Sequence, residues 1–513
     1  MEQEAVVIKD LSKSFGSVQA NRNISIDVRR GEILALLGEN GSGKSTLVNM
    51  LAGIYAPESG SIFINGKEYT FSSPQDAIAA GIGMVHQHFK LVEVMDALEN
   101  ITLGEKNGSF FINRRQIKNK ILELEKTYGF SIDPDQKIYT MSVSQKQTVE
   151  IIKMLYHGAK VLILDEPTAV LTPQETDTLF DILRGMKKQG CSIIIITHKL
   201  GEVMRISDRV TVLRKGKLSG TVNTAETTQQ QLAEMMVGSS LSLEVKRAKV
   251  QRTADPMLEV NQLVVRNANG GKALNGVTFN LYGGEILGVA GIVGSGQKEL
   301  CETITGMTKA EKGSVLFCKE DLLDMTPLEI KRRGVRMNFV PEDRLGMGLV
   351  AGMDITDNVL LRSYNDNKGI LVDRSIGKEK AEQIVERYDI ATPSIHHIVK
   401  QLSGGNIQKV LLGRELEMQP KLLIASYPFR GLDVGATNTI MEMLNKQKEK
   451  GVAILLIAED LDQMCSLCDR VMVMHNGETM GVVNPEQSSK EEIGLMMMGE
   501  HKADATHEAG GTK

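Results

Sequence analysis

A glycine-rich stretch near the start of the chain has the residue types that hold phosphate groups. Residues 38–45 read GENGSGKS and fit the pattern G-x-x-x-x-G-K-[ST]. Glycines allow backbone N–H groups to curl around phosphate oxygens, the Lys44 ammonium can reach the outer phosphates, and the Ser45 hydroxyl can bind Mg²⁺. The preceding ILALL is typical of a strand and the following STLVNMLAG of a helix, as this pattern requires. The stretch therefore predicts a site for a nucleotide and Mg²⁺.

An acidic pair follows an apolar run further along the chain. In VLILDEP, residues 161–167, four apolar residues precede Asp165 and Glu166. A buried strand that ends in two carboxylates can place one of them on Mg²⁺, through the ion's water, and the other on a water that attacks a phosphate. Such a pair is common by itself, but downstream of a phosphate-binding loop it predicts hydrolysis of a nucleoside triphosphate.

The elements that position these residues occur twice, because the second half of the chain repeats the first. RRGEILALLGENGSGKSTL matches YGGEILGVAGIVGSGQKEL, and KVLILDEPTAVLTPQE matches KLLIASYPFRGLDVGA. Each copy of the repeat spans about half of the chain. This indicates tandem domains, since the units of a solenoid span only about 20–50 residues. In each half apolar strand-like runs alternate with helical stretches, which predicts an α/β fold on a largely parallel sheet.

The composition between the repeated halves gives the expected domain boundaries. We expect domains at residues 1–238 and 257–500, joined by the polar and basic linker SSLSLEVKRAKVQRTADP at 239–256. The last residues, 501–513, read HKADATHEAGGTK and predict a flexible tail.

The bulk composition bears on location and partners. The chain has 513 residues and a net charge of −4, so no overall basic field would attract nucleic acid. Its first residues, MEQEAVVIKD, do not resemble a secretion signal, and its apolar runs are short of the roughly 20 residues of a spanning helix. We expect a cytoplasmic protein without a membrane span. Cys465 and Cys468 form a CxxC on an expected helix, and without a second such pair we expect them to face the core.

Four stretches carry a family resemblance: GENGSGKST, VHQHF, LDEPT and IITHK. Their order and spacing resemble the nucleotide-binding domain of ATP-binding cassette (ABC) proteins, and the resemblance extends over both halves. It implies two tandem P-loop NTPase domains of the ABC type, each with a helical signature subdomain, and an ATPase that uses ATP and Mg²⁺. By position it implies that Gln87 senses the γ-phosphate and contacts a transmembrane partner. It also implies that His198 contacts the γ-phosphate and that Phe15 stacks on adenine.

The patterns and the resemblance together give the expected site residues. The expected catalytic residues are Lys44, Gln87, Glu166 and His198. Mg²⁺ is expected on Ser45, Gln87 and Asp165. ATP is expected to contact Phe15, Gly38, Asn40, Gly41, Ser42, Gly43, Lys44, Ser45, Thr46, Ser403, Gly404 and Gly405.

The serine and two glycines from the second half resemble part of the family's signature, which the resemblance implies acts on a partner domain. In the family each ATP lies between the phosphate-binding loop of one domain and the LSGGQ signature of the other. The second half reads LSGGNIQ, whereas the first half reads MSVSQ. The second half has instead lost the matching residues of its own loop and strand ends. Gln297 and Lys298 replace Lys44 and Ser45, and Ser426 and Tyr427 replace Asp165 and Glu166. Glu342 and Glu459 replace Gln87 and His198.

The losses in the two halves fall on the two parts of one composite site. We therefore expect head-to-tail pairing, within one chain or between two chains. One site would be competent, and the other would be degenerate and would not hydrolyse ATP.

A tandem chain with one degenerate site is similar to the ATPases of bacterial importers for monosaccharides and nucleosides. These work at the cytoplasmic face of the membrane with two integral-membrane permease subunits and an extracytoplasmic substrate-binding protein. GMVHQHFKLV, residues 83–92, is similar to the nucleoside branch, whose binding proteins are surface lipoproteins, so we expect nucleoside import. Import of a monosaccharide such as ribose or galactose is the alternative.

Other classes of protein fit the sequence less well. Tandem ABC proteins that act on the ribosome carry a long basic insert between two intact sites, and DNA-repair members carry zinc-binding cysteine clusters. This chain has neither feature. An ABC exporter is a further alternative, because the ATPase does not encode the direction of transport. A non-catalytic scaffold is disfavoured by the intact set Lys44, Ser45, Asp165, Glu166, His198 and Ser403.

Overall fold

The computed structural model of the chain contains two compact units. The first unit spans residues 1–243 and the second spans residues 244–513. The structure describes all residues except 1–3, 17, 88, 105–112, 170, 239–246, 268–269, 293, 334, 363, 365–373 and 501–513. The expected tail, the first part of the expected linker and His88 of the nucleoside-like stretch therefore lie outside the described residues.

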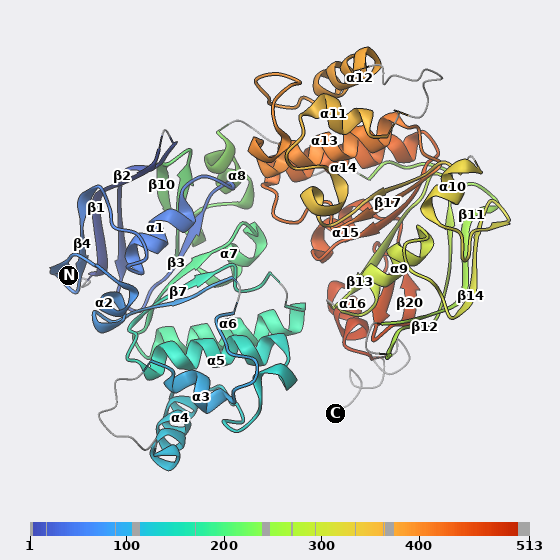
Figure 1. The fold of residues 1–513 in the computed structure, drawn as a ribbon. Helices are drawn as coiled ribbons and strands as arrows, with labels where there is room; N and C mark the ends of the chain where they lie inside the picture. The colour runs from blue at the N-terminus through green and yellow to red at the C-terminus, as the bar shows by residue number, and fades with distance from the viewer. Residues whose placement is uncertain are drawn as a thin grey trace. The chain divides into compact units, whose positions relative to one another are not determined.

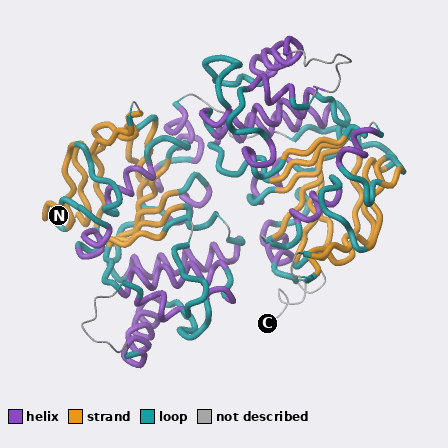
Figure 2. The backbone as a smooth tube through the Cα atoms, viewed as in Figure 1, coloured by secondary structure: helices purple, strands orange, loops and turns teal. Residues whose placement is uncertain are grey.

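The first unit contains two sheets (Figure 1, Figure 2). A six-stranded sheet has the order β10-β9-β3-β8-β7-β6, with β10 antiparallel to β9 and the other neighbours parallel. A four-stranded antiparallel sheet has the order β2-β1-β4-β5. The strands are β1 (Glu4–Phe15), β2 (Val18–Arg29), β3 (Ile33–Leu37), β4 (Ser59–Ile64), β5 (Lys67–Tyr69), β6 (Ile82–Val85), β7 (Val161–Asp165), β8 (Ser192–Ile196), β9 (Arg209–Arg214) and β10 (Lys217–Asn223). The helices are α1 (Lys44–Leu51), α2 (Pro74–Ala79), α3 (Ala97–Thr102), α4 (Arg114–Tyr128), α5 (Val143–Tyr156), α6 (Pro173–Lys188), α7 (Leu200–Ile206) and α8 (Gln229–Val237), with short 3₁₀ turns η1 (Ile138–Thr140) and η2 (Thr224–Glu226).

Alternate side chains of the parallel strands enter two separate cores. In β7, Leu162 and Leu164 belong to one core while Val161 and Ile163 belong to the other. Because both faces of such a sheet are covered, its strands are apolar without a break, as ILALL in β3 shows. The largely parallel α/β sheet predicted from the sequence is confirmed.

A helical cluster of α3, α4 and α5 shares the core on one face of this sheet. Figure 1 shows the cluster on the side of the unit away from β1, β2 and β4. Each helix begins at a polar cap, since Asp96, Asn113 and Ser142 accept a backbone N–H from the first turn of α3, α4 and α5. The helical subdomain expected from the family resemblance is therefore present, and α5 begins within the MSVSQ stretch.

The second unit repeats this layout. Its six-stranded sheet has the order β16-β17-β18-β13-β19-β20, with β20 antiparallel to β19, and its antiparallel sheet has the order β12-β11-β14-β15. The strands are β11 (Pro256–Arg266), β12 (Lys272–Tyr282), β13 (Ile286–Gly291), β14 (Lys312–Phe317), β15 (Glu320–Asp321), β16 (Met337–Val340), β17 (Leu422–Ser426), β18 (Ala453–Ile457), β19 (Arg470–His475) and β20 (Glu478–Val483). The helices are α9 (Gln297–Ile304), α10 (Pro327–Arg332), α11 (Ile355–Leu360), α12 (Arg374–Arg387), α13 (Gly404–Glu417), α14 (Val434–Glu449), α15 (Leu461–Leu467) and α16 (Lys490–Met497), with the π-helical turn η3 (Arg344–Gly348) and the 3₁₀ turn η5 (Val399–Gln401). Among the helices of the described residues, none combines the length and the apolar character needed to cross a bilayer.

The described part of the expected linker lies against the second unit. The side chain of Lys448 is fully buried, donates to the carbonyl oxygen of Ala248 at 2.5 Å and pairs with Asp469 at 2.7 Å. The Arg247 guanidinium donates to the carbonyl oxygen of Cys465 at 2.6 Å. These contacts fix the chain before β11 on the surface of the second unit.

An arginine–glutamate ion pair ties the two sheets together in each unit, and the pair of the first unit is buried. Arg209 of β9 and Glu32 pair at 2.6 Å, and their side chains are 10% and 5% exposed. Arg209 also donates to the carbonyl oxygen of Asp27 in β2 at 2.8 Å. In the second unit Arg470 and Glu285 form the same pair at 2.6 Å.

Removing one partner of this buried pair leaves the other charge uncompensated. We expect Arg209→Met to lower the free energy of unfolding of the first unit by about 3 kcal/mol. Arg184→Met is the matched control, because Arg184 and Asp181 form an exposed pair at 2.9 Å whose loss costs less than about 1 kcal/mol. Urea denaturation followed by circular dichroism measures both changes, and equal effects would contradict a stabilising role of the buried pair.

Candidate nucleotide site

The strand order of the first unit brings four sequence motifs to one edge of the sheet. β3, β8, β7 and β6 are neighbours in this order and run parallel, so their carboxyl ends meet at the same edge. The phosphate-binding loop follows β3 and His198 follows β8. Asp165 ends β7, Glu166 comes next, and Gln87 follows β6. Residues far apart in the sequence therefore lie along one edge.

The phosphate-binding loop packs closely on its own unit. A Cβ on Gly38 would lie 2.4 Å from the carbonyl oxygen of Leu213, and a Cβ on Gly43 would lie 2.3 Å from that of Ala20. Gly43 also has φ 99° where α1 begins, a conformation that favours glycine. From the sequence we expected these glycines to make room for phosphates. At these two positions the backbone of the unit itself already requires glycine.

Lys44 lies within this loop. Its ammonium donates to the carbonyl oxygens of Gly38 at 2.7 Å and Glu39 at 3.0 Å, and its side chain is buried. The Ser42 hydroxyl is also buried and has no hydrogen-bond partner among the described residues. A buried cation, an unsatisfied hydroxyl and the start of α1 together fit a phosphate group. The other expected loop residues lie nearer the surface, with Thr46 half-buried and Asn40, Gly41 and Ser45 exposed.

Glu166 is the centre of a hydrogen-bonded cluster. Its Oε1 lies 2.9 Å from His198 Nδ1, and its Oε2 accepts a hydrogen bond from Gln87 Nε2 at 2.9 Å. Glu166 has φ 47°, in the left-handed region that residues other than glycine rarely occupy, and its N–H donates to the carbonyl oxygen of Ile196 at 2.9 Å. Backbone strain of this kind often occurs at functional sites. Here the strained residue is Glu166, whose carboxylate is hydrogen-bonded to His198 and Gln87.

The two adjacent carboxyl groups differ in their affinity for a proton. Burial, together with the charge of Glu166, raises the pKa of Asp165 to about 6. Burial also raises the pKa of Glu166, but the hydrogen bond with His198 and its charge more than offset this. The charges of Lys44 and Lys199 act in the same direction, so the pKa of Glu166 lies below its usual value. Glu166 is thus ionised at neutral pH. The carboxylate of Asp165 is disfavoured by burial and by the charge of Glu166, so a cation beside Asp165 would be favoured.

The oxygen donors at this edge fit Mg²⁺. Asp165 offers a carboxylate, Ser45 a hydroxyl and Gln87 an amide, and Mg²⁺ prefers oxygen ligands of this kind. Gln87 donates to Glu166 through its nitrogen, which leaves its amide oxygen for an ion. No carboxylate besides that of Asp165 is needed for the ion, because Mg²⁺ takes further oxygens from phosphates and water.

An aromatic pair lies at the end of β1. Phe15 is 45% exposed and packs edge-to-face on Tyr55, with the ring centroids 5.3 Å apart. An exposed ring held by a second ring offers a face on which a base can stack. Tyr55 was not identified from the sequence, since nothing in the residues around it indicates a site. Lys199 was also not identified, although it lies in the quoted stretch IITHK directly after His198.

The matching edge of the second unit has the same backbone conformation but carries different side chains. Tyr427 also has φ 47°, and its N–H donates to the carbonyl oxygen of Ile457 at 2.8 Å. Gly296 begins α9 with φ 99°, as its counterpart begins α1. Gln297, which follows it, is 2% exposed and donates its amide to the carbonyl oxygen of Ile292 at 3.2 Å. A neutral amide thus occupies the place of the loop lysine.

The signature residues of the second unit lie at the start of α13. Ser403 caps the helix, since its Oγ accepts the backbone N–H of Asn406 at 3.4 Å and its side-chain amide at 2.9 Å. Gly404 is the first residue of the helix, and a Cβ on Gly405 would lie 2.9 Å from the Cβ of Ala436. None of the three signature residues is buried, so the N-terminal end of α13 is accessible to an anion.

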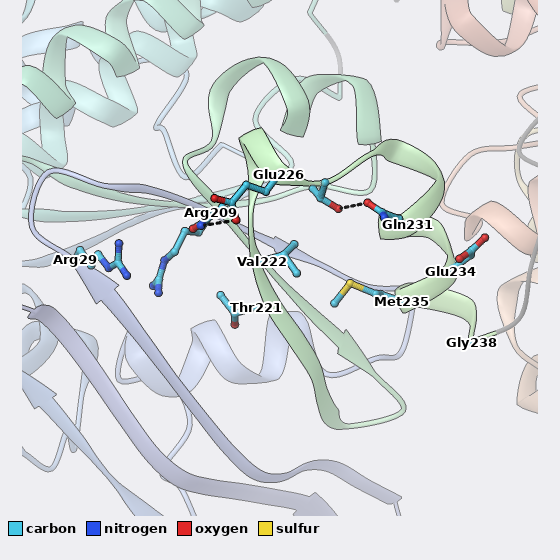
Figure 3. Close-up of a pocket in the computed structure, with 11 residues that line it drawn as sticks. Arg29, Arg209, Thr221, Val222, Glu226, Gln231, Glu234, Met235 and Gly238 are labelled. Carbon is cyan, nitrogen blue, oxygen red and sulfur yellow. Dashed lines mark hydrogen bonds between the residues drawn. The ribbon is translucent and has the colours of Figure 1, made fainter.

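A cavity of about 980 Å³ in the first unit lies apart from these residues. Figure 3 shows Arg29, Arg209, Val222 and Met235 around it, and these side chains come from β2, β9, β10 and α8. No residue expected to bind ATP or Mg²⁺ lines this cavity. The candidate nucleotide site is therefore the open edge of the sheet and not this hollow.

The raised pKa of Asp165 predicts a pH-dependent stability. Its pKa in the folded chain, about 6, lies above the ordinary value of 3.8, so deprotonation of this carboxyl destabilises the fold. The resulting decrease in the free energy of unfolding is small near pH 4, grows as the pH rises and is complete above about pH 6. In buffer without Mg²⁺ and nucleotide, we expect Asp165→Asn to raise the free energy of unfolding by roughly 1–2 kcal/mol at pH 7.5, with allowance for solvent screening.

Urea denaturation at several pH values measures this effect, and the gain should shrink as the pH falls from 6 to 4. Asp135→Asn is the control, because the hydrogen bonds of Lys118 and Arg114 hold the pKa of Asp135 below its usual value. This control should give no gain at pH 7.5. A gain from Asp165→Asn that is the same at every pH would contradict the assignment.

Comparisons with known proteins agree with this geometry. The family model described as ABC transporter matches residues 21–169 and 274–429. The nucleoside import ATP-binding protein NupA of Lactococcus lactis subsp. cremoris is 42% identical, over 97% of this chain and 99% of its own length. The guanosine import ATP-binding protein NupO of Bacillus subtilis is 40% identical, over 97% and 98%. The glucose import ATP-binding protein TsgD13 of Haloferax volcanii is 39% identical, over 97% and 96%.

A solved structure has the same fold over most of the chain. The archaeal ribosome recycling factor aABCE1, in complex with the ribosomal stalk protein aP1, aligns with a TM-score of 0.62 over 96% of this chain and 92% of that chain. At 17% identity this likeness shows the fold alone. The two family matches include the phosphate-binding loop and the acidic strand end of the first half and their counterparts in the second. The chain belongs to the ABC transporter family, as an ATPase with two ATP-binding cassettes in tandem.

Proposed function

We propose that this chain is the ATP-hydrolysing subunit of an ABC importer and that it energises the uptake of nucleosides. ATP binds to the phosphate-binding loop of the first unit, and the signature of a second unit, from the same chain or another, completes the site. The corresponding centre of the second unit does not hydrolyse ATP. The chain acts at the cytoplasmic face of the membrane, with two integral-membrane permease subunits and an extracytoplasmic substrate-binding lipoprotein.

The hydrogen-bonded carboxylate of Glu166 carries this proposal. It is ionised at neutral pH, and His198 and Gln87 each hold one of its oxygens at 2.9 Å. Such a group can accept a proton from a water while the water oxygen bonds to the γ-phosphorus and the bond to the β–γ bridging oxygen breaks. Because two side chains orient the base before ATP arrives, little reorganisation is needed in the transition state.

The other residues of this edge would bind and orient ATP. Phe15 would stack on adenine, and the Lys44 ammonium would exchange loop carbonyls for phosphate oxygens. Ser45, Asp165 and Gln87 would hold Mg²⁺, which when bound neutralises charge on the outer phosphates. The start of α13 in the second unit, with Ser403, Gly404 and Gly405, would supply further donors to the γ-phosphate.

The chemistry of the second unit supports a degenerate centre. Gln297 is neutral where a lysine is needed, and Ser426 is a poor ligand where an aspartate is needed. Burial, and after it the charge of Glu459, raises the pKa of Tyr427, so this hydroxyl stays neutral and is no base. The second unit nevertheless has an intact signature, as expected if this signature completes the competent site of the first unit's phosphate-binding loop.

Nucleosides are the proposed cargo. Two of the relatives are named for the import of nucleosides or guanosine, and GMVHQHFKLV supports the same branch. The glucose import relative has nearly the same identity, so a monosaccharide is the alternative cargo.

Glu166→Gln tests the catalytic base. The amide keeps the size of the side chain but cannot accept a proton, so the ATPase rate should fall at least about a hundredfold. Tyr427→Phe changes the matching position of the second unit and should leave the rate within about twofold. Phosphate release by the purified assembly at saturating ATP and Mg²⁺ measures both. A substantial residual rate in Glu166→Gln would contradict the assignment of Glu166 as the catalytic base.

Uptake by cells tests the transport function. The gene is deleted and restored as wild type or as Glu166→Gln, and the uptake of labelled uridine, guanosine, ribose and galactose is followed. We expect loss of nucleoside uptake that only the wild type restores. Loss of sugar uptake alone would replace the cargo with a monosaccharide, and unchanged uptake of all four compounds would contradict the importer assignment.

A further inference from the structure

An arginine lies between two acidic side chains at the degenerate edge of the second unit. Arg430 Nη1 pairs with Glu342 Oε1, and Arg430 Nε pairs with Glu459 Oε1 at 3.3 Å. Its guanidinium also lies 6.0 Å from the centroid of the Tyr427 ring. One cation thus joins the residues that follow β16, β17 and β18.

The first unit has no counterpart of this arginine. In the repeat, Arg430 matches Ala169, and the two acidic residues match Gln87 and His198. The first unit therefore has its carboxylates at the end of β7, with Gln87 and His198 after the strands on either side. The second unit has carboxylates after β16 and β18 and none at the end of β17, which lies between them. A guanidinium of the same unit pairs with both carboxylates and offsets part of their charge.

A second arginine connects this cluster to the signature of the same unit. Arg344, the first residue of η3, donates through Nη2 to the carbonyl oxygen of Arg430. A Cβ on Gly404 would lie 3.6 Å from Arg344 Nη1 and 3.9 Å from the carbonyl oxygen of Gly431. The guanidinium of Arg344 and the backbone that follows Arg430 therefore border the first residue of α13.

A cavity of about 630 Å³ borders both arginines, and Glu342, Ser426 and Ile407 also line it. Ile407 lies in the first turns of α13. The arginine cluster and the start of the signature helix are thus two walls of one hollow within the second unit.

We propose that Arg430 is a positioning residue for ATP hydrolysis. By pairing with Glu342 and Glu459, its guanidinium fixes the backbone at position 430, whose carbonyl oxygen accepts a hydrogen bond from Arg344. In this way it helps to hold the signature at the start of α13 in place when no nucleotide or metal is bound to the second unit. This inference rests on the proposed function, because the signature matters for hydrolysis only if it completes the site of the first unit's phosphate-binding loop.

The charges explain why a guanidinium suits this position. Without it, Glu342 and Glu459 are two carboxylates that converge on one place, and like charges repel. A guanidinium presents donors in a rigid planar fork and can serve two carboxylates at once, whereas an ammonium is a point charge. Lysine at position 430 should therefore replace the charge but only part of the positioning.

The test measures ATP hydrolysis by the full-length chain in its purified assembly. Arg430→Ala should lower kcat roughly three- to thirty-fold, the range of substitutions that act through a neighbouring element. KM for ATP should change less than about twofold, because the phosphate-binding loop and the aromatic pair of the first unit are untouched. Neither excess ATP nor excess Mg²⁺ should restore kcat. Arg430→Lys should give an intermediate kcat.

Two further variants separate positioning from folding. Glu342→Gln/Glu459→Gln removes both anchors of Arg430 with little change in size and should lower kcat in the same way. Arg333→Ala is the matched control, because Arg333 pairs with Glu320 at 2.8 Å on the surface of the same unit. This control should leave kcat unchanged. If Arg430→Ala reduces only the amount of folded protein, and kcat per folded chain is normal in both test variants, the inference is wrong.

Ser403→Ala distinguishes a failure of this inference from a failure of the proposed function. If Ser403→Ala leaves kcat unchanged, the signature does not serve the competent site and the proposed pairing fails. If Ser403→Ala lowers kcat while the Arg430 and double glutamine variants do not, the pairing stands and the positioning role of Arg430 is overturned. A fall in kcat with all three supports both.

Discussion

The parallel hydrogen bonding of β3, β8, β7 and β6 is the constraint on which the candidate site depends. It sets the ends of four strands side by side, so that a loop, a histidine, two carboxylates and a glutamine reach one edge. Both faces of this sheet must be buried, which requires two cores. The antiparallel sheet covers one face and the helical cluster, whose α5 begins in the signature segment, shares the core on the other.

The two units use one backbone for two arrangements of charge. Glu166 and Tyr427 have the same φ of 47° and make the same backbone hydrogen bond to the neighbouring strand. The first unit places an oriented carboxylate there, and the second places a neutral ring beside Arg430. The difference between the two edges therefore lies in their side chains and not in their fold.

Much of the architecture could be read from the sequence because the patterns are local. VLILD is a strand that carries its own carboxylate, GENGSGKS is a loop directly after a strand, and the repeat doubles both signals. Contacts between distant segments have no local pattern. Tyr55 beside Phe15, and Arg344 beside both Gly404 and the carbonyl of Arg430, join residues whose own surroundings look ordinary. The replacement of Ala169 by Arg430 was visible in the repeat, but its partners were not.

The sequence by itself determined the α/β class, the tandem repeat, the phosphate-binding loop and the sorting of intact and lost motifs between the halves. These follow from residue types at fixed spacing, which short stretches of chain retain in any surroundings. Only the tertiary structure decided which strands are neighbours and therefore which side chains share hydrogen bonds. It also decided that burial raises the pKa of Glu166 while His198 lowers it. The pKa of a carboxyl group depends on its solvation and on the charges near it in space, and neither follows from distance along the chain.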